Sequence, residues 1–313
     1  MAETLLKLTD ITKKFPGVLA LNKVSLDIKE AEVLALVGEN GAGKSTLIKI
    51  LTGALGGWTG EILWKGEKLK IQQPREAQRA GISTIYQELT LCPDISVSEN
   101  VFLGREPKKN GLIDWDKMNK MTEEVLKKLE VRVSPTAKVG SLSVATQQLI
   151  EIARALTMNA QLIIMDEPTS SLSEHEVLNL MKIIKDLKAN GISILYISHK
   201  FNEIFEISDR ISVLRDGEYV DTVNTSQADL DRVLEMMVGR TVNVRFKVRT
   251  NKIGKEIFAV ENLTSKGVLK DICFNLYEGE ILGVSGLVGA GRTEMARAIF
   301  GIDKSDSGEI TIG

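Results

Sequence analysis

The segment VLALVGENGAGKSTLIKIL at residues 33–51 decides the fold. Its first five residues form an apolar run that predicts a buried strand, and the residues after Ser45 have the apolar spacing of a helix. Between the two, Gly38, Gly43, Lys44 and Ser45 match the GxxxxGK[ST] pattern of a phosphate-binding loop. A short apolar strand, a glycine-rich turn and a helix in this order predict an α/β domain with a mostly parallel core sheet.

The loop is expected to hold the phosphates of a nucleotide. Its glycines let the backbone curl so that successive N–H groups point at phosphate oxygens, and the helix N-terminus adds a partial positive charge. Lys44 would reach the β and γ phosphates, and Ser45 would give its hydroxyl to Mg²⁺. The alternative is a glycine-rich turn with a chance Lys-Ser pair, which the flanking strand and helix disfavour. The predicted nucleotide-binding residues of the loop are Gly38, Glu39, Asn40, Gly41, Ala42, Gly43, Lys44, Ser45 and Thr46.

A second apolar strand, LIIM at 162–165, is followed by an acidic pair, Asp166 and Glu167. Ligands of open α/β sheets lie at the carboxyl ends of the strands. We therefore expect Asp166 to hold Mg²⁺ through water and Glu167 to orient or deprotonate an attacking water. A solvated acidic pair at a strand end is the alternative.

The chain has two histidines, for which we expect different roles. His199 follows the predicted strand ISILYI at 192–197, where it would donate a hydrogen bond to the γ-phosphate. A capping or surface histidine is the ordinary alternative. His175 takes that ordinary role, because it lies in the first turn of a helix that we expect to begin at Ser173 and to end near Gly191. A further helix is expected from Asp116 to Leu129, and its apolar stripe is expected to pack inward, with the members Met118, Met121, Val125 and Leu129.

The chain repeats its own beginning at an offset of 248 residues. EVLALVG at 32–38 corresponds to EILGVSG at 280–286, and five glycines correspond in pairs. Gly38, Gly41, Gly43, Gly53 and Gly60 match Gly286, Gly289, Gly291, Gly301 and Gly308. The second copy reaches only the counterpart of Lys65, which predicts a tandem protein truncated in its second domain.

The repeat divides the chain into three predicted parts. A first domain covers residues 1–240, a linker covers 241–255, and residues 256–313 are the start of a second domain. In this second part the strand and helix of the loop would lack most of their sheet and covering helices. Exposed apolar side chains that could drive association are expected there, namely Ile281, Leu282, Ile299 and Phe300.

Composition excludes several classes of protein. The 313 residues are 43% hydrophobic and 26% charged, so a packed core is expected. The formal net charge of -2 gives no overall basic surface for nucleic acid. Apolar runs are far shorter than the roughly 18 residues of a membrane span, and the N-terminus does not read as a secretory signal. Cys92 and Cys273 lie far apart, as in proteins of a reducing compartment, and the cytoplasm is the expected location.

Together these motifs resemble the ATP-binding subunit of an ABC transporter. The resemblance implies a P-loop NTPase fold with an antiparallel β subdomain and a helical insertion at about 88–155. Gln87, in TIYQEL, matches the glutamine that touches Mg²⁺ and the attacking water. LSVAT at 142–146 resembles the signature segment, so Ser143 would contact the γ-phosphate bound by the opposite domain. Phe15 matches the aromatic residue that stacks on adenine, and SSLS at 170–173 resembles the loop at the dimer interface.

Within this family, the chain most resembles the tandem ATPases of bacterial ribose, xylose and galactose importers. The sequences of residues 80–106 and of GLVGAGRTE at 286–294 carry this resemblance. It implies ATP and Mg²⁺ as cofactors, and membrane-spanning permease subunits, an extracytoplasmic sugar-binding protein and a second ATPase domain as partners. It places the chain peripherally on the cytoplasmic face of the membrane, with no nucleic-acid partner.

Three alternatives stay open. A nucleoside importer shares much of this wording. A soluble ABC ATPase acting on ribosomes or DNA is a different class, disfavoured because the chain has no basic arm. The isolated chain would be an inactive binding module if no partner supplied a signature in trans.

Two residues depart from the family pattern. Ala145 stands where the general signature has glycine, and a methyl group there would cost about 1 kcal/mol or more if the backbone took a positive φ or approached phosphate. Contact by Ser143 is therefore expected to be weakened but not abolished. Arg292 stands opposite Lys44, with Thr293 opposite Ser45, and its bulkier, forked side chain predicts poor hydrolysis at the second site.

Overall fold

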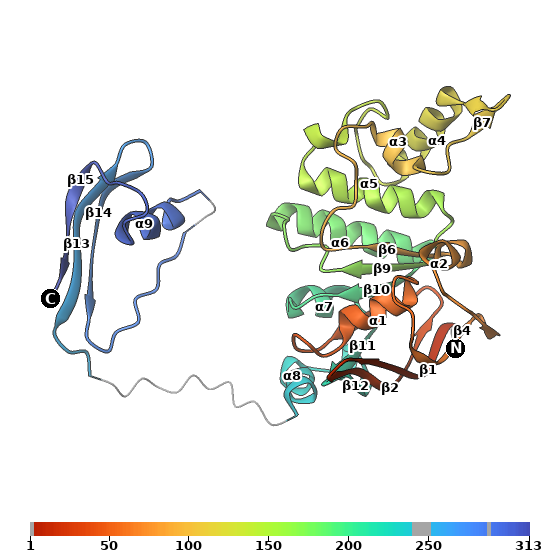
Figure 1. Cartoon of the computed structure of the whole chain (residues 1–313), viewed down its shortest axis with the longest axis horizontal. Helices are drawn as coiled ribbons and strands as arrows, with labels where there is room; N and C mark the ends of the chain where they lie inside the picture. Colours follow the sequence, from red (N-terminus) through yellow and green to blue (C-terminus); the bar gives the residue numbers. More distant parts are fainter. Residues whose placement is uncertain (1–2, 240–251, 287–288) are drawn as a thin grey trace. The chain divides into compact units, whose positions relative to one another are not determined.

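The computed structural model describes residues 3–239, 252–286 and 289–313 of the chain. It divides into two compact units, residues 1–242 and 243–313, each with its own sheets (Figure 1). Within the described ranges, no helix has both the length and the apolar character needed to cross a bilayer.

The core of the first unit is a six-stranded sheet in the order β12-β11-β3-β10-β9-β6. All neighbours are parallel except β12, which pairs with β11 in the antiparallel sense. The predicted strands at 33–37, 162–165 and 192–197 are confirmed, and so is the mostly parallel core. The strands are β3 (Val33–Val37), β6 (Ile82–Ile85), β9 (Leu162–Asp166), β10 (Ser193–Ile197), β11 (Arg210–Arg215) and β12 (Glu218–Asn224).

An antiparallel sheet forms a second layer in the order β2-β1-β4-β5. Its strands are β1 (Thr4–Phe15), β2 (Val18–Lys29), β4 (Thr59–Trp64) and β5 (Glu67–Lys68). Helix α1 (Lys44–Leu51) has four buried apolar residues, and they share one hydrophobic core with side chains of both sheets. This packing fixes the start of α1, and with it the glycine-rich loop, against the ends of the core strands.

Helices α3, α4 and α5 lie together at the end of the unit away from the antiparallel sheet (Figure 1). A second core joins them to α6 and to the parallel sheet. The elements of this part are α2 (Pro74–Ala80), α3 (Val97–Phe102), β7 (Lys108–Lys109), β8 (Leu112–Ile113), α4 (Trp115–Lys128), η1 (Val139–Ser141) and α5 (Val144–Thr157). Packing of the α4 stripe is confirmed for Met118, Val125 and Leu129 but is wrong for Met121, which is 38% exposed because it borders an open cavity.

The helix predicted from Ser173 is α6 (Glu174–Ala189). The Ser173 backbone N–H and hydroxyl donate to Glu176, and Gly191 follows the helix with a left-handed φ of 84°, as the sequence predicts. The remaining elements of the unit are α7 (Phe201–Ile207), η2 (Thr225–Gln227) and α8 (Leu230–Val238).

The second unit repeats the antiparallel layer of the first. Strands β13 (Glu256–Ser265), β14 (Leu269–Tyr277) and β15 (Ser307–Ile312) form a sheet in the order β14-β13-β15. Helix α9 (Arg292–Ile299) and β15 begin and end 248 residues after α1 and β4. Irregular positions recur too. Asp10 and Asn262, which follow the residues paired with Glu61 and Glu309 in the two sheets, have φ of 52° and 50°. Lys23 and Asp271, 248 residues apart, have φ of 49° and 48°.

The strand that the repeat predicts at 280–286 does not form, and Ile281 is 88% exposed. In the first unit β3 takes its hydrogen bonds from β10 and β11, and the described part of the second unit holds no counterpart of those strands. Leu282 and Phe300 are exposed as predicted, whereas Ile299 packs against the small core of the unit. Most of the predicted linker at 241–255 lies outside the described residues.

Candidate functional site

Four strands of the core sheet end side by side at one edge. The parallel register aligns Ile85 of β6, Met165 of β9, Tyr196 of β10 and Ala35 of β3. Just beyond this row follow the residues singled out by the sequence, namely Gln87, Asp166, Glu167, His199 and Gly38. The sheet therefore brings four motifs from distant parts of the chain to one edge.

The glycine-rich loop is held tightly by its surroundings. A Cβ at Gly38 would lie 2.3 Å from the Leu214 carbonyl oxygen. Gly43 precedes α1 with φ 99°, and a Cβ there would lie 2.7 Å from both the Ala20 carbonyl oxygen and Leu21 Cδ2. The first N–H groups of α1 have no partner within the helix and point toward the loop, where they can bind an anion.

We expect Gly43→Ala to lower the free energy of unfolding by about 2–4 kcal/mol, since backbone strain and overpacking add there. Gly41 is the matched control, because its φ is 88° but nothing lies within 4 Å of a Cβ at that position. Gly41→Ala should therefore cost only about 1 kcal/mol, from strain alone. Urea unfolding of both variants measures the difference, and equal losses would contradict the close packing of Gly43.

Lys44 lies folded over the loop. Its Nζ donates hydrogen bonds to the carbonyl oxygens of Gly38, at 2.6 Å, and Glu39, at 3.0 Å. Burial lowers the pKa of Lys44, while the charges of Glu167 and Asp166 act in the opposite direction. An anion at the loop would stabilise the charged form of Lys44 further.

Glu167 and His199 meet at the same edge. His199 Nδ1 lies 3.3 Å from Glu167 Oε1, and the two side chains are 69% and 25% exposed. Glu167 has an uncommon left-handed φ of 48°, and its backbone N–H donates to the Ile197 carbonyl oxygen at 2.9 Å. Such strain at the end of a buried strand is typical of functional sites.

Asp166 is the carboxylate predicted to hold Mg²⁺. Burial raises the pKa of Asp166, the charge of Glu167 raises it further, and Lys44 partly offsets both effects. A divalent cation would favour the ionised form of this carboxylate. Carboxylate, hydroxyl and amide oxygens from Asp166, Ser45 and Gln87 are the ligands that Mg²⁺ prefers. Among the described residues, no three His, Cys, Asp or Glu side chains are grouped so that they could hold a metal ion.

Phe15 and Gln87 each lie at or just beyond the end of a strand. Phe15 ends β1 and is 37% exposed, and its ring centroid lies 5.0 Å from Lys13 Nζ. The strand that follows, β2, leads to Ala20 beside the loop. Gln87 is exposed two residues beyond β6. The roles themselves stay predictions.

Ser143 caps the N-terminus of α5, and its exposed hydroxyl accepts the Thr146 N–H at 3.3 Å. Ala145 lies inside this helix and does not have a positive φ, so the sequence-based expectation of backbone strain at Ala145 is wrong. A helix has no need of glycine at this position. Close approach of its methyl group to phosphate stays a prediction.

Two buried residues escaped the sequence reasoning. The side-chain amide of Gln148 donates to the Pro168 carbonyl oxygen, which joins α5 to the segment after Glu167. Glu203, on α7, accepts hydrogen bonds from three hydroxyl groups around the same edge. A glutamate in the first turn of a helix is typical of a surface residue, so the sequence carries no signal for this role.

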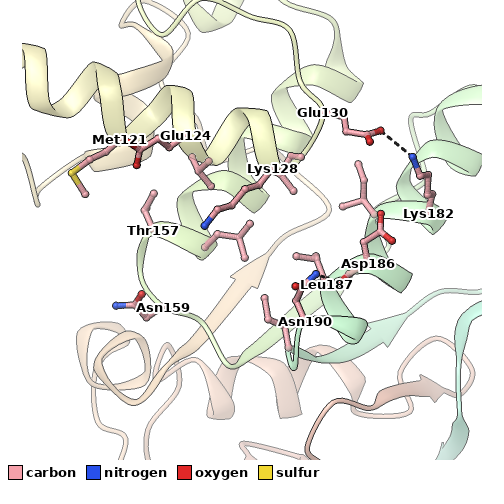
Figure 2. A pocket seen from close by; sticks show the side chains of 15 residues that line it. Met121, Glu124, Lys128, Glu130, Thr157, Asn159, Lys182, Asp186, Leu187 and Asn190 are labelled. Atoms are coloured by element: carbon pink, nitrogen blue, oxygen red, sulfur yellow. Dashed lines mark hydrogen bonds and ion pairs between the residues drawn. The ribbon is translucent and has the colours of Figure 1, made fainter.

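A cavity of about 650 Å³ lies elsewhere, among α4, α5 and α6 (Figure 2). Apolar side chains line it together with charged ones, and the Glu130–Lys182 ion pair, at 3.0 Å, borders it. None of the predicted site residues lines this cavity.

Comparison with known proteins agrees with this geometry. Residues 21–170 match the model of the ABC transporter family. The chain is 48% identical to a ribose import ATP-binding protein of Rubrobacter xylanophilus, over 98% of this chain and 62% of that protein. It is 46% identical to a xylose import ATP-binding protein of Thermoanaerobacter pseudethanolicus, over 99% of this chain and 63% of that protein. The chain thus spans less than two thirds of the length of these relatives.

Solved structures give the same answer for the fold. The ADP conformation of MJ1267, an ATP-binding cassette of an ABC transporter, superposes with a TM-score of 0.65 at 26% identity, over 76% of this chain and 99% of that one. The dimeric bacterial cassette MJ0796 gives a TM-score of 0.60 at 29% identity, over 71% and 99% of the two chains.

Proposed function

Because the chain belongs to the ABC transporter family, we propose that it binds and hydrolyses ATP to drive the import of a monosaccharide. One observation carries the proposal: the phosphate loop, the Asp166–Glu167 pair and His199 lie at adjacent strand ends of one sheet. An acid pair and a histidine beside a phosphate loop are the parts that phosphoryl transfer to water requires.

The loop N–H groups and Lys44 bind the phosphates of ATP and hold the γ-phosphate near Glu167. Asp166, Ser45 and Gln87 would hold Mg²⁺, which when bound neutralises charge on the phosphates. Glu167 accepts a proton from the water that attacks the γ-phosphorus, while the bond to the bridging oxygen breaks and ADP leaves. As an imidazolium, His199 donates from Nδ1 to Glu167 Oε1, which lies 3.3 Å away, and from Nε2 to the γ-phosphate.

We further propose that two such domains close face to face. Each ATP then lies between the loop of one domain and Ser143 of the other, and Phe15 stacks on the adenine. The opposite domain is either a second ATPase domain or another copy of this chain. Closure moves the segment from Gln87 to Gly104 against permease subunits at the cytoplasmic face of the membrane, and an extracytoplasmic binding protein delivers the sugar. The relatives named for ribose and xylose support a sugar as substrate.

Solution mass tests the clamp. With Glu167→Gln, which should hold ATP without turnover, we expect a dimer in ATP and Mg²⁺ and a monomer in ADP, measured by light scattering. Adding Lys44→Ala to this variant should abolish the dimer, because the phosphates lose their main cationic contact. A chain that binds no ATP would contradict the proposed function, and a monomer that binds ATP would contradict closure between two copies.

A further inference from the structure

Glu203 is a buried carboxylate that the proposed mechanism does not use. It lies on α7 and is only 3% exposed. Burial of a carboxylate costs free energy unless several hydrogen-bond donors contact it, so the burial of Glu203 calls for an explanation.

Four donors converge on Glu203. Its Oε2 accepts hydrogen bonds from the hydroxyl groups of Thr169 at 2.8 Å, Tyr196 at 2.8 Å and Ser198 at 3.2 Å. Its Oε1 lies 3.2 Å from Lys200 Nζ, which also donates to the Thr169 carbonyl oxygen at 3.1 Å. Burial and the charge of Glu203 raise the pKa of Tyr196, so this hydroxyl stays protonated and donates.

The donors belong to the two segments that carry the reacting groups. Thr169 lies two residues after Glu167, and Ser198 and Lys200 flank His199. At the site itself the Glu167 N–H donates to the Ile197 carbonyl oxygen at 2.9 Å, and the Glu167 and His199 side chains approach to 3.3 Å. Glu203 joins the same segments from the buried side, where solvent does not compete for the hydrogen bonds.

We infer that Glu203 is a positioning residue that holds the Glu167 and His199 segments at the spacing required for hydrolysis. Its carboxylate is buried and acts through Thr169 and Ser198. The inference rests on the proposed function for its effect on turnover, but the placement of His199 can be tested without any nucleotide.

The first test is kinetic. Glu203→Gln should lower ATP turnover of the full chain about 10-fold to 100-fold, the loss expected for misplaced reacting groups, with ATP affinity unchanged. The matched control is Glu206→Gln on the same helix, since Glu206 is exposed and forms an ion pair with Lys185 at 2.9 Å. Turnover should be unaffected in this control.

Two variants of Thr169 test the inference even if Glu203→Gln does not fold. Thr169→Val removes the hydroxyl that reaches Glu203, whereas Thr169→Ser keeps it. Turnover should fall in the valine variant and stay near that of the unaltered chain in the serine variant. Equal loss in both would overturn the inference, because a packing defect would then explain it.

The second test observes His199 directly. The chain has only two histidines, so histidine-selective labelling gives two sets of ring signals in NMR spectra, assigned with His175→Gln. Without nucleotide, Glu203→Gln and Thr169→Val should shift or broaden the His199 signals and leave those of His175 in place. Unmoved His199 signals would overturn the inference even if turnover fell. Failure of the unaltered chain to bind ATP would refute the proposed function alone, since the NMR result stands without it.

Discussion

Glu167→Gln is expected to reduce the rate of ATP hydrolysis by about 100-fold or more while ATP still binds with its ordinary affinity. The amide has nearly the shape of the carboxylate but cannot accept the proton of the attacking water. The substitution also removes a negative charge beside Asp166, so electrostatic repulsion between the site and the nucleotide does not increase. Steady-state phosphate release and equilibrium nucleotide titration measure the two quantities separately.

Glu206→Gln serves again as the control, because it makes the same chemical change at an exposed carboxylate away from the site. Its turnover should match that of the unaltered chain. Near-normal hydrolysis by Glu167→Gln would remove Glu167 from its proposed role and leave the water without an assigned base.

Lys44→Ala should weaken ATP binding by about 10-fold to 100-fold. A hydrogen bond to a charged group contributes about 1.5–3 kcal/mol, and each 1.4 kcal/mol corresponds to a factor of ten in affinity. The half-buried position of Lys44 makes the loss larger than at a fully solvated lysine, since water screens the attraction less. Titration with a fluorescent ATP analogue measures the dissociation constant.

Lys49→Ala is the matched control, since Lys49 lies on the same helix but is exposed. Removal of one positive charge from α1 should by itself leave ATP affinity nearly unchanged. If both variants bind ATP equally well, the assignment of the loop at 38–46 to nucleotide phosphates is wrong.

Local patterns predicted most of the fold that positions the site. The strand before Gly38 and the strand before Asp166 are short apolar runs bounded by turn residues, and such runs are buried on both faces of a parallel sheet. Helix α6 carries its own start signal in the Ser173–Glu176 pair. Each of these elements is determined by residues adjacent in the sequence, so the sequence of this chain alone suffices to predict it.

Contacts between residues far apart in the sequence could not be predicted in the same way. Glu203 stands apart from Thr169 by 34 positions, and only the register of β9 and β10 brings the segments together. The segment at 280–286 has the composition of a central strand, yet a central strand exists only where neighbours supply hydrogen bonds on both sides. The pattern of a strand is local, but its pairing is not.

The recurring left-handed residues of the two antiparallel sheets have a consequence for how such sheets diverge. Asp10 corresponds to Asn262 and Lys23 to Asp271, so the backbone irregularity recurs although the side chains differ in charge. Bulges of this kind bend and coil a strand, and the bend lets the sheet wrap around a helix. The curvature of these sheets thus depends on the path of the backbone rather than on which side chains stand at these positions. Sequence at these positions can drift between the halves of a duplicated chain while the cradle for α1 or α9 keeps its shape.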